Sequence, residues 1–256
     1  MSTVNEKMTA IADPIRSLTK EKQPLSLDDM ANHTEQLVEA NADLEKVLYG
    51  TDFGGKSQYD EFWDCLLNSG KRTDLEKVFR GADFSKTLRG FDPPYTIKPR
   101  YAGSMFAESS GITRITKGQI DFSNCASGSY CFYKCSDLIE IEEIHLPNNN
   151  TYMFSDSLVL EKIGKLIIPE STTTISSPFF NDKKLTHIAI EGKIPQTISF
   201  QWCSLLTHDS LTSIINALLN IKDTGTTATL TLHADAKAKL SDSDRATITQ
   251  KGWTLA

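Results

Sequence analysis

The sequence predicts an α+β protein in which N-terminal helices precede a short stack of repeated units, with an α/β segment closing the C-terminal end. Three observations predict this architecture. A spacing of aromatic and aliphatic residues recurs through the middle of the chain, helical periodicity precedes it, and the pattern changes after Asp209. The predicted segments are a helical anchoring and oligomerisation segment at 1–50, a helical lead-in and N-terminal cap at 51–98, the repeats at 99–208, and the cap at 209–256.

Length and composition limit which partners and cellular compartments are expected for this protein. With 256 residues the chain can bury a substantial core without disulfides or metals. The net charge is −6 and the basic residues form no cluster, so we expect no nucleic-acid partner. Five cysteines, an odd number, favour a reducing compartment over a disulfide framework. No apolar run is long enough for a membrane span or a signal-peptide core, which predicts synthesis in a cytoplasm.

Two helices are predicted in the first segment. Residues 4–20 place apolar side chains every three to four positions, and Ser26 resembles the N-cap of a helix that runs to about Leu48. In that second helix Met30, Leu37 and Leu44 recur every seven residues, as in a coiled coil, although His33 stands at an intervening core position. The helix therefore packs either against sister chains or on its own domain.

Two shorter helices are predicted in the lead-in. Their apolar faces are Tyr59, Phe62, Trp63 and Leu66 in the first, and Leu75, Val78 and Phe79 in the second. The prolines of 91–99 cannot continue a helix, because proline lacks the amide donor and fixes φ. The repeats are therefore expected to begin just after them.

The repeat consists of a phenylalanine followed by aliphatic residues six and nine places later. The full copies are Phe106, Ile112 and Ile115; Phe132, Leu138 and Ile141; Phe154, Leu160 and Ile163; and Phe179, Leu185 and Ile188. A partial copy begins at Phe200 with Leu206. Successive phenylalanines are 26, 22, 25 and 21 residues apart, within the roughly 20–29 residues of leucine-rich repeats. One such unit cannot bury its apolar face alone, so stacking into a short solenoid is predicted, with these residues as its core.

The second half of each unit alternates like a strand. Residues 141–149 fit the leucine-rich pattern L-x-x-L-x-L-x-x-N, with Asn149 in the asparagine position, whose side chain bonds the backbone inside the turn. Ser171 and Lys193 replace that asparagine in the next two units, so the solenoid should be irregular.

The pattern changes in the last segment. Leu211, Ile214, Ile215, Leu218 and Leu219 form the stripe of a helix of about three turns. A strand is predicted over 226–233, helix over 234–250 with Ser241 as a second cap, and a closing strand over 253–255. A terminal unit of different design shields the last repeat from water.

The motif F-x-x-C/S/D-x-x-L-x-x-I, present as Phe132–Ile141, resembles the BspA-like leucine-rich repeats of Firmicutes and their prophages. The exit at 206–215 and the ending at 251–256 resemble the close of such proteins in phages, and residues 4–13 with 27–31 resemble the start of tail-region proteins. Pro14 departs from an uninterrupted opening helix. The resemblance implies a leucine-rich solenoid displayed at a surface for adhesion, and in phages a virion or tail accessory.

No residue is assigned to catalysis, metal binding or a cofactor. Cys125, Cys131, Cys135 and Cys203 lack the spacing of a zinc site. Cys135 and Cys203 fall three residues after the motif phenylalanine. The other copies have Ser109, Ser157 and Asp182 at this position, so a small residue that packs in the turn is expected there. The five histidines, His33, His145, His187, His208 and His233, are dispersed. Asp137, Glu140, Glu142 and Glu143 cluster, either as a solvated face or as a pair that hydrolyses glycosides.

Aromatic side chains are the candidates for surface contact. Tyr130, Tyr133, Tyr152 and Trp202 neighbour the motif phenylalanines and either line one side of the solenoid or fill its corners. Rings with a polar edge suit contact with a glycan or a protein.

The function expected from the resemblance is a non-enzymatic phage tail or virion protein. Its repeat face would bind a host-surface glycan or protein, or another virion protein, and its N-terminal segment would form a homo-oligomer. The alternatives are a cytoplasmic bacterial binding module of the same fold and a carbohydrate-active solenoid enzyme.

Overall fold

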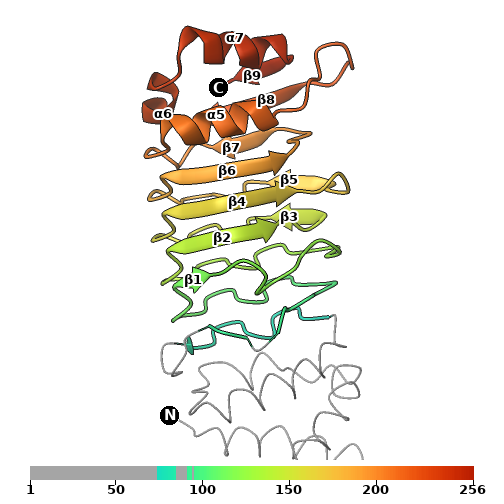
Figure 1. Ribbon diagram of the computed structural model, residues 1–256, viewed down its shortest axis with the longest axis vertical. Coiled ribbons are helices and arrows are strands. Elements are labelled where there is room, and N and C mark those ends of the chain that lie inside the picture. Colours follow the sequence, from blue (N-terminus) through green and yellow to red (C-terminus); the bar gives the residue numbers. More distant parts are fainter. Residues whose placement is uncertain (1–73, 85–90, 94) are drawn as a thin grey trace, which may run out of the picture.

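The structure is a computed structural model that describes residues 74–84, 91–93 and 95–256 (Figure 1). The segment 1–50, with its two predicted helices, and the helix predicted at Tyr59–Leu66 lie outside the described residues. The described part is α+β, and every strand pairing in it is parallel.

The main sheet runs along one side of the molecule. Its strands, in spatial order, are β1 (Arg114–Ile115), β2 (Glu140–His145), β4 (Lys162–Ile168) and β6 (His187–Gly192). The register pairs Ile141 with Ile163 and Ile163 with Ile188, which are equivalent positions of successive repeats. Each repeat therefore adds one strand, and the sequence spacing sets the register.

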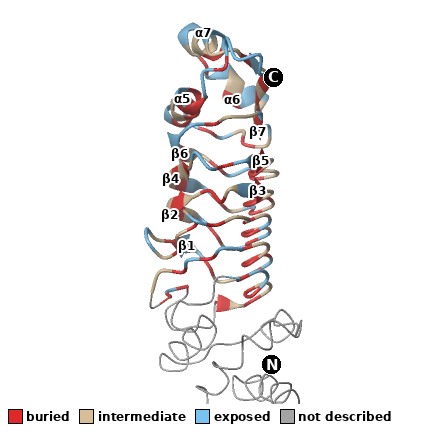
Figure 2. Ribbon diagram, turned by 90° about the vertical axis from the view of Figure 1, so that its right-hand side faces the viewer, coloured by how far each residue is buried: buried red, intermediate tan, exposed pale blue. Residues whose placement is uncertain are grey.

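Shorter strands lie on the opposite side. They are β3 (Asn149–Thr151) paired with β5 (Thr174–Ser176), and β7 (Ile198–Phe200) paired with β8 (Ala228–Leu232), which pairs with β9 (Trp253–Leu255). Tightly wound turns rise along this side, with buried residues between them and the main sheet (Figure 2). The twelve core residues named from the full copies of the repeat are all at most 1% exposed.

A ladder of six stacked phenylalanines fills the interior. Phe79, Phe106, Phe132, Phe154, Phe179 and Phe200 succeed one another with ring centroids 5.1–5.7 Å apart and planes within 17° of parallel. Aromatic pairs of this kind add roughly 0.5–1.5 kcal/mol to what burial of the rings contributes. The ladder therefore couples each unit to the next.

The prediction of a helix at Leu75, Val78 and Phe79 is wrong. Residues 74–84 form turns and isolated bridges, and the Leu75 and Phe79 amides donate to the carbonyls of Tyr101 and Met105 in the following unit, both at 2.8 Å. Apolar residues at i, i+3 and i+4 fit a helix, but here they fit a tight turn whose amides bond to a neighbouring unit. The stack thus begins before residue 99.

The turns repeat an unusual backbone pattern. In the first five units, residues two before and two after the ladder phenylalanine have positive φ, from 45° to 67°. They are Lys77 and Gly81, Ser104 and Glu108, Tyr130 and Lys134, Tyr152 and Asp156, and Ser177 and Asn181. This conformation costs about 1–2 kcal/mol at each non-glycine residue. It persists because alternate amides donate across units, as from Phe106 to the Cys131 carbonyl and from Phe132 to the Met153 carbonyl, both at 2.8 Å.

The position three after the phenylalanine holds a buried hydrogen-bond column. Ser109 donates to the Phe79 carbonyl (2.7 Å), Cys135 to the Phe106 carbonyl (3.1 Å) and Ser157 to the Phe132 carbonyl (2.8 Å). The small residues expected at this position are therefore present to bridge units.

Asp182 occupies the same position one unit later. Its Oδ1 accepts from the Ser157 amide (3.1 Å), whereas its buried Oδ2 has no partner among the described residues. Burial raises the pKa of Asp182 well above its usual value, the Ser157 amide opposes this, and the nearby Asp156 adds to it. A protonated Asp182 would have a side-chain donor, as Ser109, Cys135 and Ser157 have.

The asparagine that bonds inside the turn is Asn150, not Asn149 as predicted. Asn150 is fully buried and donates to the Pro147 carbonyl at 3.2 Å, whereas Asn149 is exposed. Side chains alternate sides along β3, so a shift of one residue exchanges the inner and outer positions.

A helix covers the last strand of the main sheet. The helix α5 (His208–Ala217) packs beside β6, at the edge where another strand would otherwise extend the main sheet (Figure 1). The edge amides of Ile188 and Ile190 donate instead to the hydroxyls of Ser210 (3.0 Å) and Ser213 (2.8 Å). The serines thus satisfy a strand edge that would otherwise be available for pairing with another chain.

Replacing Ser210 with alanine is expected to lower the free energy of unfolding by about 1–3 kcal/mol, because the Ile188 amide would be left buried without a partner. Urea denaturation measures the change. Ser136→Ala is the matched control, since Ser136 is exposed and contacts only its neighbour Asp137 through its hydroxyl. Equal stabilities for the two variants would show that the edge amide does not depend on Ser210.

The remaining C-terminal elements form where the sequence predicts them. The predicted helix over 234–250 is two helices, α6 (Ala234–Ala238) and α7 (Asp242–Gln250), and Ser241 forms a capping box with Asp244 at the start of α7. Lys251 Nζ donates to the carbonyls of Ile215, Asn216 and Leu218 at 2.8–3.0 Å. A cation at these free carbonyls stabilises the C-terminal end of α5.

Candidate binding surface

Five aromatic side chains from three successive turns and the β7 unit form a continuous row, here called the aromatic strip. Ring centroids are 5.6 Å apart for Tyr133 and Tyr130, 5.5 Å for Tyr130 and Tyr152, 5.9 Å for Tyr152 and Phe180, and 5.3 Å for Phe180 and Trp202. The four aromatics singled out in the sequence are thus brought together.

The turn geometry places these rings outside the core. Tyr130 and Tyr152 lie at the positive-φ position two before the ladder phenylalanine, whereas Tyr133 and Phe180 lie one after it. Tyr130 is 40% exposed and the other four rings are partly buried. They therefore both pack the corner and present an outer surface, so the two alternatives are not exclusive.

Phe180 is the member that the sequence analysis missed. It directly follows Phe179, and Tyr133 likewise directly follows Phe132. Comparing residues at this position across units could have identified it.

Lysines lie at the two ends of the strip. Lys134 Nζ is 5.0 Å from the Tyr133 ring centroid, and Lys183 Nζ is 5.8 Å from that of Trp202. Both distances allow cation–π attraction. The aromatic row is therefore bracketed by positive charge.

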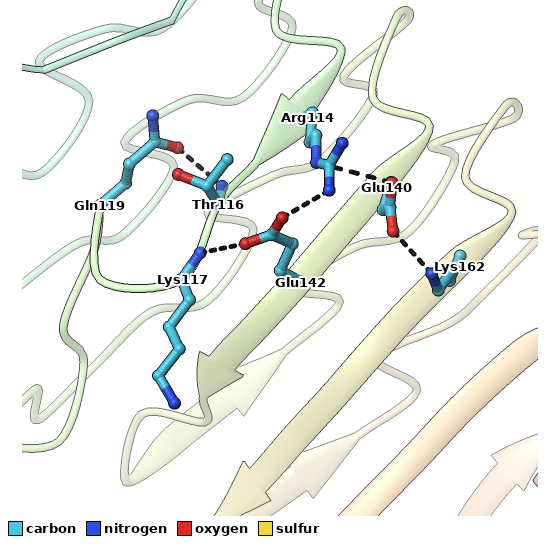
Figure 3. A network of polar contacts seen from close by, with 7 residues as sticks. All are labelled: Arg114, Thr116, Lys117, Gln119, Glu140, Glu142 and Lys162. Atoms are coloured by element: carbon cyan, nitrogen blue, oxygen red, sulfur yellow. Dashed lines mark hydrogen bonds and ion pairs between the residues drawn. The ribbon is translucent and has the colours of Figure 1, made fainter.

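The main sheet carries a separate, charged surface (Figure 3). Glu140 lies between Arg114 (3.6 Å) and Lys162 (2.8 Å). Glu142 accepts from the Arg114 guanidinium and from the Lys117 amide, the latter at 2.8 Å. The carboxylates on β2 thus contact basic groups of the neighbouring units.

A second row of charges continues this pattern. Glu143 pairs with Lys117 (3.0 Å) and Lys165 (3.7 Å), and Lys165 pairs with Glu191 (3.0 Å). The side chains are partly or largely exposed, so each pair contributes little to stability. Asp137 has a different role, because its Oδ2 accepts from the Gly111 amide at 2.7 Å in the adjacent unit.

Hydrogen bonds lower the pKa of two of these carboxyls. A hydrogen bond from the Lys117 amide lowers the pKa of Glu142, and one from the Lys117 ammonium lowers that of Glu143. The general acid of a glycoside hydrolase needs a raised pKa. The geometry favours a solvated, paired face.

The four cysteines of the described residues lie in the core. Cys125, Cys131, Cys135 and Cys203 are buried free thiols, and burial raises the pKa of Cys125 to about 11. A thiol in such surroundings is a poor nucleophile. Across 74–84, 91–93 and 95–256, no three His, Cys, Asp or Glu residues are grouped so that they could hold a metal ion.

Comparisons with family models, curated proteins and solved structures found no match for this chain. In the described part, no helix has the length and apolar character needed to cross a membrane. The candidate surface therefore rests on geometry alone.

Proposed function

We propose that this chain is a non-enzymatic binding protein of a phage tail or virion, and that the aromatic strip contacts a host-surface molecule or another virion protein. The observation that carries the proposal is the strip itself. Tyrosine and tryptophan are enriched among residues that dominate binding energies, and here they form a row across neighbouring units.

The proposed scaffold is an irregular leucine-rich-repeat solenoid of the BspA-like type. Its support is the repeat spacing, the parallel register of equivalent residues, and the phenylalanine ladder. Repeats of this kind offer extended surfaces for binding. The virion assignment rests on the resemblance of the repeat motif and the chain ends, and a gene neighbourhood of tail and lysis genes would distinguish it from a stand-alone bacterial module.

The triple variant Tyr130→Ser, Tyr133→Ser and Tyr152→Ser tests the binding surface. We expect at least about tenfold weaker adsorption to envelopes of the host bacterium or to virions depleted of this protein, because each lost ring removes a candidate anchor. Serine already occupies the equivalent positions as Ser104, Ser155 and Ser177, so the variant should fold.

The control is a triple variant of the charged sheet, Arg114→Ser, Lys162→Ser and Lys165→Ser, which changes the same number of residues on the other surface. Circular dichroism checks that both variants keep their structure. Undiminished adsorption of the tyrosine variant, or an equal loss in the sheet variant, would refute the strip as the contact surface.

A further inference from the structure

We infer that the aromatic strip docks a protein segment carrying acidic side chains next to apolar or aromatic ones, rather than a glycan. The inference rests on the proposed function, since it specifies the partner of the same surface. It follows from the orientation of the rings, the placement of the lysines, and the apolar residues nearby.

Other groups of the protein cover part of the ring faces. Tyr130 and Tyr152 stack on each other within 21° of parallel, and Tyr133, Phe180 and Trp202 meet their neighbours at steep angles of 66–90°. Lys134 and Lys183 lie over the faces of Tyr133 and Trp202. A sugar ring binds by laying its C–H groups on an aromatic face, and these contacts restrict the faces it could use.

Hydrogen-bonding capacity is also limited. Trp202 Nε1 is buried and has no hydrogen-bond partner among the described residues. Phe180 has no polar atom, so only the three tyrosines could offer hydroxyls to a polyhydroxylated ligand. At the Phe180 and Trp202 end, the rings themselves offer the hydroxyls of a glycan no exposed polar atom in exchange for lost water.

The charge at the strip favours an acidic partner. Among the described residues, no carboxylate lies within salt-bridge distance of Lys134 or Lys183. The carboxylates of Asp156 and Glu108 lie near Lys134, but each has a closer partner: Asp156 accepts from Asn181 at 2.6 Å and Glu108 pairs with Arg80 at 3.1 Å. The two lysines are thus available to pair with carboxylates of a partner.

Exposed apolar side chains lie in the connections that leave the strip. Leu158 is 52% exposed and Leu205 is 50% exposed, and they follow the strip residues Tyr152 and Trp202 by six and three positions in the sequence. Such side chains offer a glycan no hydrogen bonds, whereas they can anchor an aromatic or aliphatic side chain of a protein.

A displayed library of random 12-residue peptides tests the inference. It is selected on the intact protein after depletion on the Tyr130→Ser, Tyr133→Ser and Tyr152→Ser variant. We expect enriched peptides to combine Asp or Glu with Tyr, Phe, Trp or Leu. Their affinity should fall at least about tenfold with Lys134→Glu and Lys183→Glu, and should weaken with added salt.

Lys222→Glu and Lys98→Glu form the matched control, since they change the charge equally at exposed sites outside the strip. Glu108 occupies the position equivalent to Lys134 in the preceding unit and likewise has a positive φ. A glutamate is therefore compatible with the backbone at position 134. Selection of neutral or basic peptides, no convergence, or equal losses in test and control variants would overturn the inference.

A parallel glycan array probed with the intact protein and the tyrosine variant separates the two proposals. Glycan binding that depends on the tyrosines would overturn the acidic-protein inference while leaving the proposed binding function intact. If neither peptides nor glycans bind through the strip and the tyrosine variant still adsorbs to cells and virions, both proposals fail.

Discussion

Replacing Phe132 with alanine is expected to lower the free energy of unfolding by about 3–5 kcal/mol. The ring is fully buried and stacks on Phe106 at 5.4 Å and on Phe154 at 5.7 Å, with Phe122 against its edge at 6.3 Å. Its removal leaves a cavity between units. Urea denaturation followed by far-ultraviolet circular dichroism measures the loss.

Two variants serve as controls for this prediction. Phe132→Leu keeps part of the volume and should cost less. Tyr130→Ser removes a ring from the surface two residues away and should cost much less, since serine occupies that position in other units. A similar loss for Phe132→Ala and Tyr130→Ser would show that the ladder does not dominate stability. A fall in the denaturant slope would indicate that the units on either side unfold separately.

Replacing Asp182 with asparagine is expected to make the protein more stable at neutral and alkaline pH. Burial raises the pKa of this carboxyl in the folded state, whereas in the unfolded chain it titrates near pH 4. Between these two values the folded state holds one more proton. The free energy of unfolding of the unmodified protein therefore falls by about 1.4 kcal/mol per pH unit in that range.

The contribution of protonated Asp182 is complete below about pH 4 and is lost as the pH rises through the folded-state pKa. The charged and titratable groups that face it are Asp156 and the Cys203 thiol. The ionised carboxyl would repel the Asp156 carboxylate, whereas burial keeps Cys203 in its neutral thiol form. An asparagine keeps the oxygen that accepts from Ser157 and adds an amide donor that needs no proton.

Urea denaturation from pH 5 to pH 8 checks this prediction. The asparagine variant should lack the slope due to Asp182, whereas Asp223→Asn, at an exposed loop position, should keep it. Identical slopes for the unmodified protein and Asp182→Asn would show that Asp182 is ionised in the fold and that Oδ2 finds another partner.

Much of the fold follows from spacing because the repeat has a strong pattern. A phenylalanine with aliphatic residues six and nine places later predicts which side chains are buried, and the structure buries all twelve. The strand at Trp253–Leu255 and the cap at Ser241 were also predicted, since local patterns of alternation and capping specify them. These features depend on contacts close in sequence or on a strict repeat.

Features that depend on contacts between units escaped prediction. Phe79 lacks an aliphatic residue six places later, where Ser85 stands, so its place in the ladder is evident only from bonds to the following unit. Likewise, Asn149 fits the motif, but the alternation along β3 buries Asn150 instead.

The candidate surface, too, could be predicted from the sequence only in part. The sequence by itself determined which aromatic residues neighbour the ladder and that Asp137, Glu140, Glu142 and Glu143 cluster in and just before one strand. Only the tertiary structure decided that Phe180 joins the row, that lysines cover its end faces, and that the carboxylates pair with Arg114, Lys117, Lys162 and Lys165. The physical reason is that most of these contacts join side chains of different units, 19–28 residues apart in the sequence, where positive-φ turns set their direction and local periodicity carries no information about it.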